Sequence, residues 1–341
     1  MSSNKSRMPI MLLSGFLGSG KTTLLSRLLQ SEEMNNVMVI VNEFGEVGLD
    51  HHLIRRIDED HDRTLLIGGG CICCSTRKDL VTCLNQLLNR IQKSDMVVDR
   101  VIIETTGLAD PAPIMFTVLR DPVLQYHFYI EKVIVTVDAV NGSLHLKQPE
   151  TVKQITVADK IIITKLDIAG IEVETALTEA INCLNPSAHI LKAVYGEIDL
   201  SDLLSEQVLS MDKEIRHRDK STGKMESHTS DTKSISISFD NPIDWNAFGL
   251  WLSMLLYARG EDVFRVKGLL DVGEQGPVSL NGVQHIIHPP DHLEKWPVQD
   301  RRSHLIFIVR NIDPAQIVSS LDAFQHILGA IPRSLELKTL T

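Results

Sequence analysis

The chain has no long apolar run and no excess of positive charge. None of its apolar stretches reaches the about 20 residues that a membrane helix needs, and residues 1–7 are too polar for a signal peptide. Its 34 Lys and Arg are outnumbered by 44 Asp and Glu, giving a formal net charge of -10, whereas nucleic-acid binding depends on basic side chains that neutralise phosphates. We therefore expect neither a membrane nor a nucleic acid among its partners.

Cysteines are also few, since the chain has only five. Cys71, Cys73 and Cys74 crowd together in a way that suits a metal or redox site better than a disulfide framework. Cys83 and Cys183 each stand alone on an apolar helical face, where a free cysteine behaves as a small buried apolar residue. This usage predicts a protein of the reducing cytoplasm.

The remaining composition, 43% hydrophobic and 23% charged over 341 residues, is that of an ordinary folded protein. The first two-thirds alternates β-branched runs with amphipathic stretches, which predicts an α/β fold with a mainly parallel sheet covered on both faces. Strands are expected at Pro9–Ser14, Val37–Val41, Thr64–Ile67, Arg100–Glu104, Lys132–Val137, Lys160–Thr164 and Ala188–Lys192. Helices are expected at Lys21–Gln30, Arg77–Lys93 and Glu172–Leu184.

Residues 211–233 divide the chain, because this segment is nearly free of large apolar side chains and cannot build a core. The pattern predicts a nucleotide-binding domain over 1–210, a polar linker over 211–233 and a small α+β domain over 234–341. In the last domain, strands are expected at Ser234–Phe239, Val263–Leu270, Gln284–Ile287 and His304–Arg310. Helices are expected at Asp244–Tyr257 and Pro314–Leu328, before a polar tail.

The segment GFLGSGKTT fits the pattern G-x-x-x-x-G-K-[ST] and lies between an apolar strand and a helix. Its glycines let the backbone wrap closely around phosphate, so that N–H groups and the helix N-terminus face the anion. Lys21 is expected at the β- and γ-phosphates and the Thr22 hydroxyl at Mg²⁺. These features predict a P-loop NTPase domain whose phosphate contacts are Gly15, Gly18, Ser19, Gly20, Lys21, Thr22 and Thr23.

An acidic partner is expected at the end of a neighbouring buried strand, where it can hold Mg²⁺ or its water shell. Glu104, which ends the apolar run VIIE, meets that description. Gly107, three residues later, suits a backbone donor that approaches the γ-phosphate.

Base recognition is assigned to the segment TKLD, which contains Lys165 and Asp167. It matches the guanine signature N-K-x-D with Thr164 in place of Asn. An aspartate carboxylate accepts hydrogen bonds from both the ring N–H and the exocyclic amine of guanine, a pattern that adenine lacks. The segment therefore favours GTP over ATP.

The triplet Cys71, Cys73 and Cys74 follows three glycines and an apolar strand and precedes a helix. Thiolates select soft or borderline ions, here Zn²⁺ or alternatively Co²⁺. Because three thiolates do not complete a zinc site, an additional ligand is needed, and Glu43 and Glu46 are the nearest candidates. A buried, inert thiol cluster is the alternative interpretation. A loose group of His285, His288 and His292 is a second candidate for transient metal binding.

Together these motifs resemble the CobW family of P-loop GTPases and, within it, the YjiA-type branch. The resemblance covers nearly the whole chain. It rests on SGFLGSGKTT (Ser14–Thr23), VNEFGEVGLD (Val41–Asp50), GGGCICC (Gly68–Cys74), ETTGLADP (Glu104–Pro111), ITKLD (Ile163–Asp167), RVKGLL (Arg265–Leu270) and Trp296.

This resemblance implies a CobW-type C-terminal domain and GTP hydrolysis coupled to the binding or delivery of a transition metal, usually zinc or cobalt. It assigns the metal to Cys71, Cys73 and Cys74 with Glu46 as an extra ligand. Residues 42–50 correspond to the first nucleotide-responsive segment and Glu104–Asp110 to the second. Asp50 or Glu104 is expected to position the attacking water, and the C-terminal domain is expected to select a client metalloprotein.

Two other functions fit parts of the pattern. A P-loop kinase would use ATP to phosphorylate a small metabolite and would need no cysteines. A metal buffer or regulator would let nucleotide tune metal affinity without hydrolysis. Turnover is expected to be slow in the GTPase interpretation, because no arginine finger is identifiable.

Overall fold

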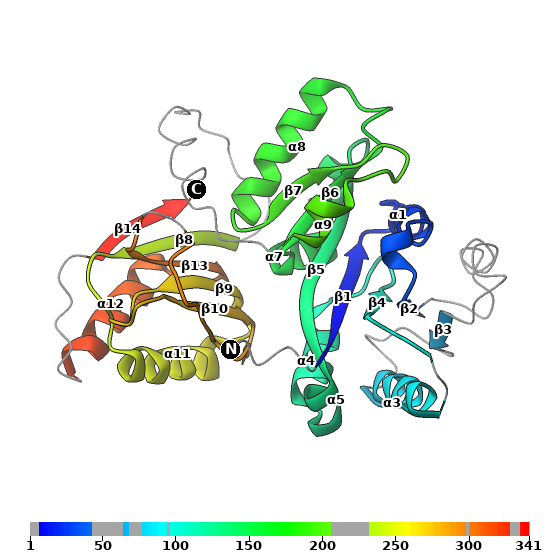
Figure 1. The fold of residues 1–341 in the computed structure, drawn as a ribbon. Helices are drawn as coiled ribbons and strands as arrows, with labels where there is room; N and C mark the ends of the chain where they lie inside the picture. Colours follow the sequence, from blue (N-terminus) through cyan, green and yellow to red (C-terminus); the bar gives the residue numbers. More distant parts are fainter. Residues whose placement is uncertain are drawn as a thin grey trace. The chain divides into compact units, whose positions relative to one another are not determined.

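The computed structural model describes residues 7–42, 64–67, 77–93, 96–205, 232–297, 300–327 and 335–340. They form two compact units, one within residues 3–179 and 188–205 and the other within 180–187 and 206–341. The first is an α/β unit and the second an α+β unit (Figure 1). The predicted fold class is confirmed.

A seven-stranded sheet with the order β3-β2-β4-β1-β5-β6-β7 forms the first unit. All of its neighbouring strands pair in parallel. The strands are β1 (Met8–Gly15), β2 (Val37–Asn42), β3 (Thr64–Ile67), β4 (Arg100–Glu104), β5 (Phe128–Asp138), β6 (Lys160–Thr164) and β7 (His189–Lys192). Because β1 lies between β4 and β5, the segments that follow these three strands meet at one edge of the sheet, where α/β proteins bind ligands.

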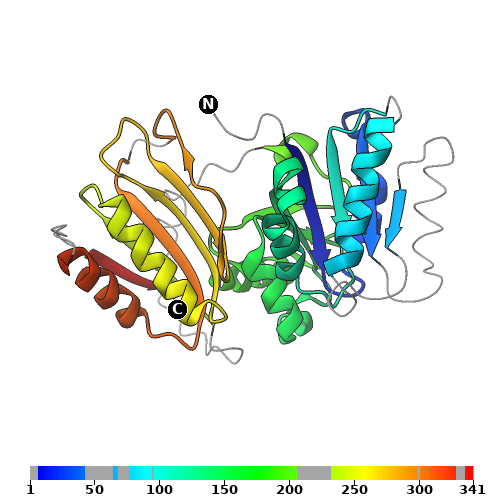
Figure 2. The same ribbon diagram turned by 90° about the horizontal axis from the view of Figure 1, so that it is seen from below.

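Helices cover both faces of this sheet. They are α1 (Lys21–Leu28), α3 (Arg77–Lys93), α4 (Ala112–Arg120), α5 (Pro122–His127), α6 (Gly142–His145), α7 (Pro149–Val157), α8 (Ile171–Leu184) and α9 (Leu200–Leu204). Leu24, Leu25 and Leu203 bring α1 and α9 into one apolar core, and α3 and α4 lie on the opposite face (Figure 2). Of the helices that the structure describes, none is long and apolar enough to cross a bilayer.

The second unit has one antiparallel sheet with the order β11-β10-β9-β13-β8-β14, and β12 pairs with β10. Its strands are β8 (Thr232–Phe239), β9 (Val263–Leu270), β10 (Val278–Val283), β11 (Ile286–Ile287), β12 (Asp291–His292), β13 (Ser303–Arg310) and β14 (Leu335–Leu340). Helices α11 (Trp245–Arg259) and α12 (Pro314–Ile327) pack against it. Aromatic rings of Phe248, Trp251 and Phe307 meet at the centre of this core.

Two predictions for the second unit are wrong. The expected strand Gln284–Ile287 contains a turn, in which Gln284 has a φ of 51° and joins β10 to β11. The polar tail contains strand β14, which pairs with β8 from Leu335↔Phe239 to Leu340↔Ser234. The tail becomes a strand because pairing with β8 overrides its weak local propensity, whereas residues 284–285 form the two-residue turn of a hairpin between β10 and β11. Strand β8 also begins at Thr232, inside the segment interpreted as linker.

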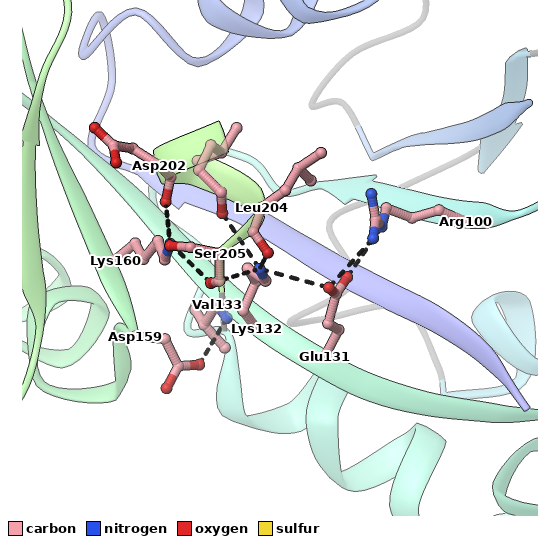
Figure 3. A network of polar contacts seen from close by, with 10 residues as sticks. Arg100, Glu131, Lys132, Val133, Asp159, Lys160, Asp202, Leu204 and Ser205 are labelled. Carbon is pink, nitrogen blue, oxygen red and sulfur yellow. Dashed lines mark hydrogen bonds and ion pairs between the residues drawn. The ribbon is translucent and has the colours of Figure 1, made fainter. Parts of the chain in front are cut away.

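Two buried lysines anchor the end of α9, beyond which the described part of the first unit stops (Figure 3). The ammonium of Lys160 donates to Asp202 O and to both Ser205 O and Oγ. The ammonium of Lys132 donates to Leu203 O and Leu204 O at 3.2 and 3.0 Å. These bonds satisfy carbonyl groups that a helix leaves unpaired at its C-terminus, where the helix dipole also favours cations.

Acidic groups balance this pair of cations. Glu131 lies 3.5 Å from Lys132 and also pairs with Arg100 at 3.0 Å. Asp159 accepts a hydrogen bond from the backbone N–H of Val133 at 2.9 Å. Burial and the neighbouring Lys132 nevertheless lower the pKa of Lys160 to about 8.

We predict that Lys160→Met lowers the free energy of unfolding by about 2 kcal/mol at pH 7, because it leaves buried carbonyl groups unpaired. Between about pH 8 and 10 the unfolded chain binds more protons at residue 160 than the folded chain does, so folding becomes more favourable as the pH rises. The advantage of the wild type should therefore widen over this range. Urea denaturation at pH 7.5 and 9.5 measures it.

Lys147→Met, at an exposed lysine of the same unit, is the matched control and should leave the free energy of unfolding nearly unchanged. An advantage of the wild type that shrinks or stays constant with pH would contradict the lowered pKa of Lys160.

Candidate functional site

A glycine-rich loop leaves the central strand β1 and enters α1. Gly15, Gly18 and Gly20 have φ values of 142°, 69° and 91°, which side chains other than hydrogen rarely allow. A Cβ at Gly15 would collide with the hydroxyl and carbonyl oxygens of Thr136 on β5, whereas Gly18 faces open space. The loop therefore lies tightly against β5 at its start and is open at its middle.

Lys21, the first residue of α1, is buried inside this loop. Its ammonium donates to the carbonyl oxygens of Gly15 and Phe16 at 2.9 and 3.1 Å. A cation is thus held within the curve of the loop and beside the N-terminus of α1, two features that favour a bound anion. Thr23, two residues further along α1, is exposed.

The side chains of Thr22, in α1, and Glu104, at the end of β4, contact each other. The Thr22 hydroxyl donates to Glu104 Oε1 at 2.8 Å, and Glu104 is only 4% exposed. Parallel pairing of Leu13 with Glu104 brings the end of β4 beside the start of the loop. A hydroxyl and a carboxylate form an all-oxygen donor set, which fits a hard cation such as Mg²⁺. The structure thus brings together the two residues that were expected to serve Mg²⁺.

The segment after β4 lies on the glycine-rich loop. Thr105 donates its backbone N–H to Leu13 O at 2.9 Å and its hydroxyl to Ser14 Oγ, also at 2.9 Å. Gly107 touches the backbone of Leu17 so closely that a Cβ would lie 2.6 Å from its nitrogen. The structure thus brings Gly107 to the loop.

Thr164, which stands where the motif N-K-x-D has asparagine, is buried at the end of β6. Its hydroxyl donates to Ser19 O at 2.8 Å and so ties the end of β6 to the loop. Ser19 is tied to β5 as well, with its hydroxyl 2.7 Å from Thr136 Oγ1. Both contacts need only a short hydroxyl side chain.

Lys165 and Asp167 follow β6 at the same edge of the sheet. Lys165 adopts a φ of 59°, and its ammonium lies 2.8 Å from Asp138 Oδ2. Asp167 is exposed, so that its carboxylate is available to a ligand. Both residues that were expected to contact the base therefore lie at the carboxyl ends of the strands.

Asp138, at the end of β5, is a residue that the sequence analysis missed. It is 1% exposed and accepts hydrogen bonds from Lys165, from Val140 N and from the Asn141 amide. Burial alone would raise its pKa, but these hydrogen bonds outweigh burial and lower the pKa. The signal was a carboxylate at the end of an apolar strand, the same signal that identified Glu104.

His145, at the end of α6, was also missed. Its ring lies 4.6 Å from the ring of Phe16 in the glycine-rich loop. Burial lowers the pKa of His145, and Lys165 contributes to this lowering while Asp138 opposes it. The residue therefore packs beside the loop, a placement that no local sequence pattern indicates.

The predicted transition-metal ligands Glu43, Glu46, Cys71, Cys73 and Cys74, and the predicted water-positioning Asp50, lie outside the described residues. Within the described ranges, no group of three or more His, Cys, Asp or Glu residues could hold a metal ion.

His285, His288 and His292, the second candidate for transient metal binding, do not form such a group in the structure. His285 Nδ1 lies 3.0 Å from Leu256 O, and His292 pairs with Glu274 at 3.4 Å, so these rings make different local contacts.

The two isolated cysteines also differ from each other. Cys83 is buried, which raises the pKa of its thiol to about 11, whereas Cys183 is exposed and its predicted burial is wrong.

Known proteins resemble this chain along most of its length. Zinc chaperone YjiA of Escherichia coli (strain K12) is 33% identical over 301 residues, covering 88% of this chain and 93% of that protein. Zinc-regulated GTPase metalloprotein activator 1 of Schizosaccharomyces pombe is 26% identical over 350 residues, covering 89% and 82%. The crystal structure of Zn(II)-bound YjiA GTPase from E. coli superposes with a TM-score of 0.69 at 27% identity, covering 93% of this chain and 99% of that one.

Family models cover both units. The model of the Cobalamin synthesis protein cobW C-terminal domain matches residues 232–325. The model described as CobW/HypB/UreG, nucleotide-binding domain, matches residues 9–192, more than half of the 341 residues, and so contains the glycine-rich loop, Glu104 and the base motif. The chain belongs to the CobW/HypB/UreG family, with a CobW C-terminal domain after its nucleotide-binding domain.

Proposed function

We propose that this protein is a GTP-hydrolysing zinc metallochaperone of the cytoplasm. The observation that carries the proposal is the meeting of the Lys21 ammonium, the Thr22–Glu104 pair and the Lys165–Asp138 pair at one edge of a parallel sheet. Relatives whose names include zinc chaperone and GTPase support the metal and the reaction.

In this proposal the glycine-rich loop and Lys21 bind the phosphates of GTP, and the Lys21 ammonium stabilises charge on the transferring phosphoryl group. Mg²⁺, when bound by Thr22 and Glu104, neutralises the β- and γ-phosphate oxygens. Asp50 or Glu104 positions the attacking water. Intrinsic turnover is expected to be slow, because the sequence motifs identify no arginine finger.

Guanine selection is assigned to Asp167, whose exposed carboxylate accepts two N–H groups of the base. Lys165 positions the base beside it, and Asp138 fixes the Lys165 side chain through the 2.8 Å ion pair. A neutral partner at position 138 would leave this ammonium less well oriented, because charge-assisted hydrogen bonds are the stronger ones.

The transition metal is assigned to Cys71, Cys73 and Cys74, with Glu43 or Glu46 completing the site. Zinc is preferred and cobalt is the alternative, because thiolates accept both. The register of the sheet supports coupling, since Asn42 and Ile67 are paired where β2 and β3 end. The segments that contain these ligands therefore start at the same edge as the P-loop and the segment after Glu104.

Coupling is proposed to run through the two segments expected to respond to nucleotide, Asn42–Asp50 and Glu104–Asp110. GTP would order Asn42–Asp50 against Glu104–Asp110 and change the metal affinity of the cysteines, and hydrolysis would reverse the change. In this scheme the GTPase occupies residues 1–210, a linker follows and ends where β8 begins at Thr232, and the C-terminal domain selects the client metalloprotein.

The proposal predicts that Zn²⁺ affinity differs between the GDP-bound protein and the protein bound to a β,γ-imido GTP analogue. Cys73→Ala should weaken Zn²⁺ binding by at least about 10-fold, because a ligand is lost, and should leave nucleotide affinity nearly unchanged. Competition with a chromophoric chelator measures Zn²⁺ affinity, and titration with a fluorescent nucleotide measures nucleotide affinity.

Cys183→Ser, at an exposed cysteine outside the triplet, is the matched control and should behave as wild type. Equal loss of metal and nucleotide binding in Cys73→Ala would mean that the thiols are structural. Single-turnover hydrolysis of GTP, with ATP in parallel, separates the GTPase from both a metal buffer and an ATP-dependent kinase.

A second prediction concerns Thr22→Ala, which removes the hydroxyl that contacts Glu104. GTP turnover should fall by about 100-fold, because transition-state charge stabilisation at such sites is worth roughly 3 kcal/mol. GDP affinity without Mg²⁺ should change much less. Turnover at increasing Mg²⁺ concentrations checks this, and a variant with normal turnover and normal Mg²⁺ dependence would remove Thr22 from the site.

A third prediction concerns Asp167→Asn, which replaces an acceptor-only carboxylate by an amide. GTP affinity should fall by about 100-fold, since two hydrogen bonds to a charged group are lost or weakened. XTP affinity should rise, because xanthine offers a carbonyl where guanine has its amine. Titration with both nucleotides tests the base assignment, and parallel losses for GTP and XTP would refute it.

A further inference from the structure

Gln154 in α7 holds the segment that follows β4. The side chain is fully buried, with 0% exposure. Its amide nitrogen donates to the carbonyl oxygens of Gly107 and Ala109 at 3.1 and 3.0 Å. One side chain, 45 to 47 residues away along the sequence, thus binds two backbone groups of a single turn.

The amide of Gln154 has only one favourable orientation. If its oxygen and nitrogen were exchanged, the amide oxygen would face two carbonyl oxygens, neither of which can donate a hydrogen bond. In the observed orientation Oε1 is buried and accepts no hydrogen bond from the described residues. Because an unpaired buried acceptor costs free energy, the two donated bonds must outweigh that cost.

Both peptide planes beside Gly107 are consequently fixed. The carbonyl of Thr106 accepts the N–H of Ala109 at 3.1 Å, and the carbonyl of Gly107 accepts Gln154. Since the peptide bond is trans, the Gly107 N–H points away from the Thr106 carbonyl and its hydrogen bond. The contact of Gly107 with the backbone of Leu17 fixes the turn against the glycine-rich loop.

We propose that Gln154 is a positioning residue, which orients the Gly107 peptide for the terminal phosphate of a nucleoside triphosphate. This inference rests on the proposed GTPase function. A preoriented N–H donor stabilises the γ-phosphate without reorganising when the nucleotide arrives. GDP lacks this phosphate, so Gln154 contributes to the preference for GTP over GDP and to turnover, although it touches neither nucleotide.

The test is Gln154→Leu, which keeps most of the side-chain volume and removes both donated hydrogen bonds. Affinity for a β,γ-imido GTP analogue should fall about 10-fold, the size of one to two lost hydrogen bonds, and kcat should fall by a similar factor. Affinity for GDP should stay within twofold, because Lys21, Thr22 and Asp167 are untouched. The ratio of the two affinities is therefore the decisive quantity.

Lys153→Met is the matched control from the same helix. Lys153 pairs with Asp110 of the same segment at 3.7 Å, but it is 41% exposed, and an exposed ion pair contributes little. This variant should keep the wild-type affinity ratio. If Gln154→Leu does not fold by circular dichroism, Gln154→Asn, whose amide is one methylene too short to reach both carbonyls, should show the same loss.

The wild type serves as the reference for the whole experiment. If it neither binds nor hydrolyses GTP, the proposed function fails. If it does both and Gln154→Leu keeps the wild-type ratio, or loses GTP and GDP affinity equally, Gln154 has a structural role only and this inference alone is overturned.

Discussion

The close packing of the glycine-rich loop against the carboxyl ends of β5 and β6 is the constraint on which the rest of the site depends. Gly15 leaves no room for a side chain beside Thr136, and Ser19 is bonded to the hydroxyls of Thr136 and Thr164. Contacts within the protein therefore fix the loop, and its shape brings the Lys21 ammonium to the carbonyls of Gly15 and Phe16. Preorganisation of this kind lowers the cost of ordering that ligand binding must otherwise meet.

The same packing determines which contacts the other strand ends can make. Glu104 can reach Thr22 because β4 pairs with β1 in the register Leu13↔Glu104. Asp138 can reach Lys165 because β5 pairs with β6 up to Asp138↔Thr164. The carboxylates of Glu104 and Asp138, each at the end of a strand, thus have different partners. Glu104 accepts a hydrogen bond from the Thr22 hydroxyl, with which it forms a donor set that fits Mg²⁺, and Asp138 pairs with Lys165 of the base motif.

Sequence reasoning found the residues that belong to contiguous motifs, and it missed those that act from a distance. The loop, Glu104 and Lys165 were predictable because each lies where an apolar strand ends, and strand ends of a parallel sheet share one edge. Gln154 was not, because it lies mid-helix and its partners are in a turn far along the chain. Pairing of β14 with β8 was missed for the same reason. The role of Thr164 became clear only from its bond to Ser19 O.

A metallochaperone needs nucleotide and metal to influence each other, and linkage makes that influence reciprocal: if GTP strengthens Zn²⁺ binding by some factor, Zn²⁺ strengthens GTP binding by the same factor. Such coupling requires an element whose contacts differ between nucleotide states. The turn after β4 is held by Gln154 from one side and by the glycine-rich loop from the other, so in the proposed mechanism it serves as a rigid reference for the γ-phosphate. Differential contacts are then most readily made by the segments that follow β2 and β3. Those two segments contain every residue assigned to the transition metal, so a change in their contacts with nucleotide reaches the metal ligands directly.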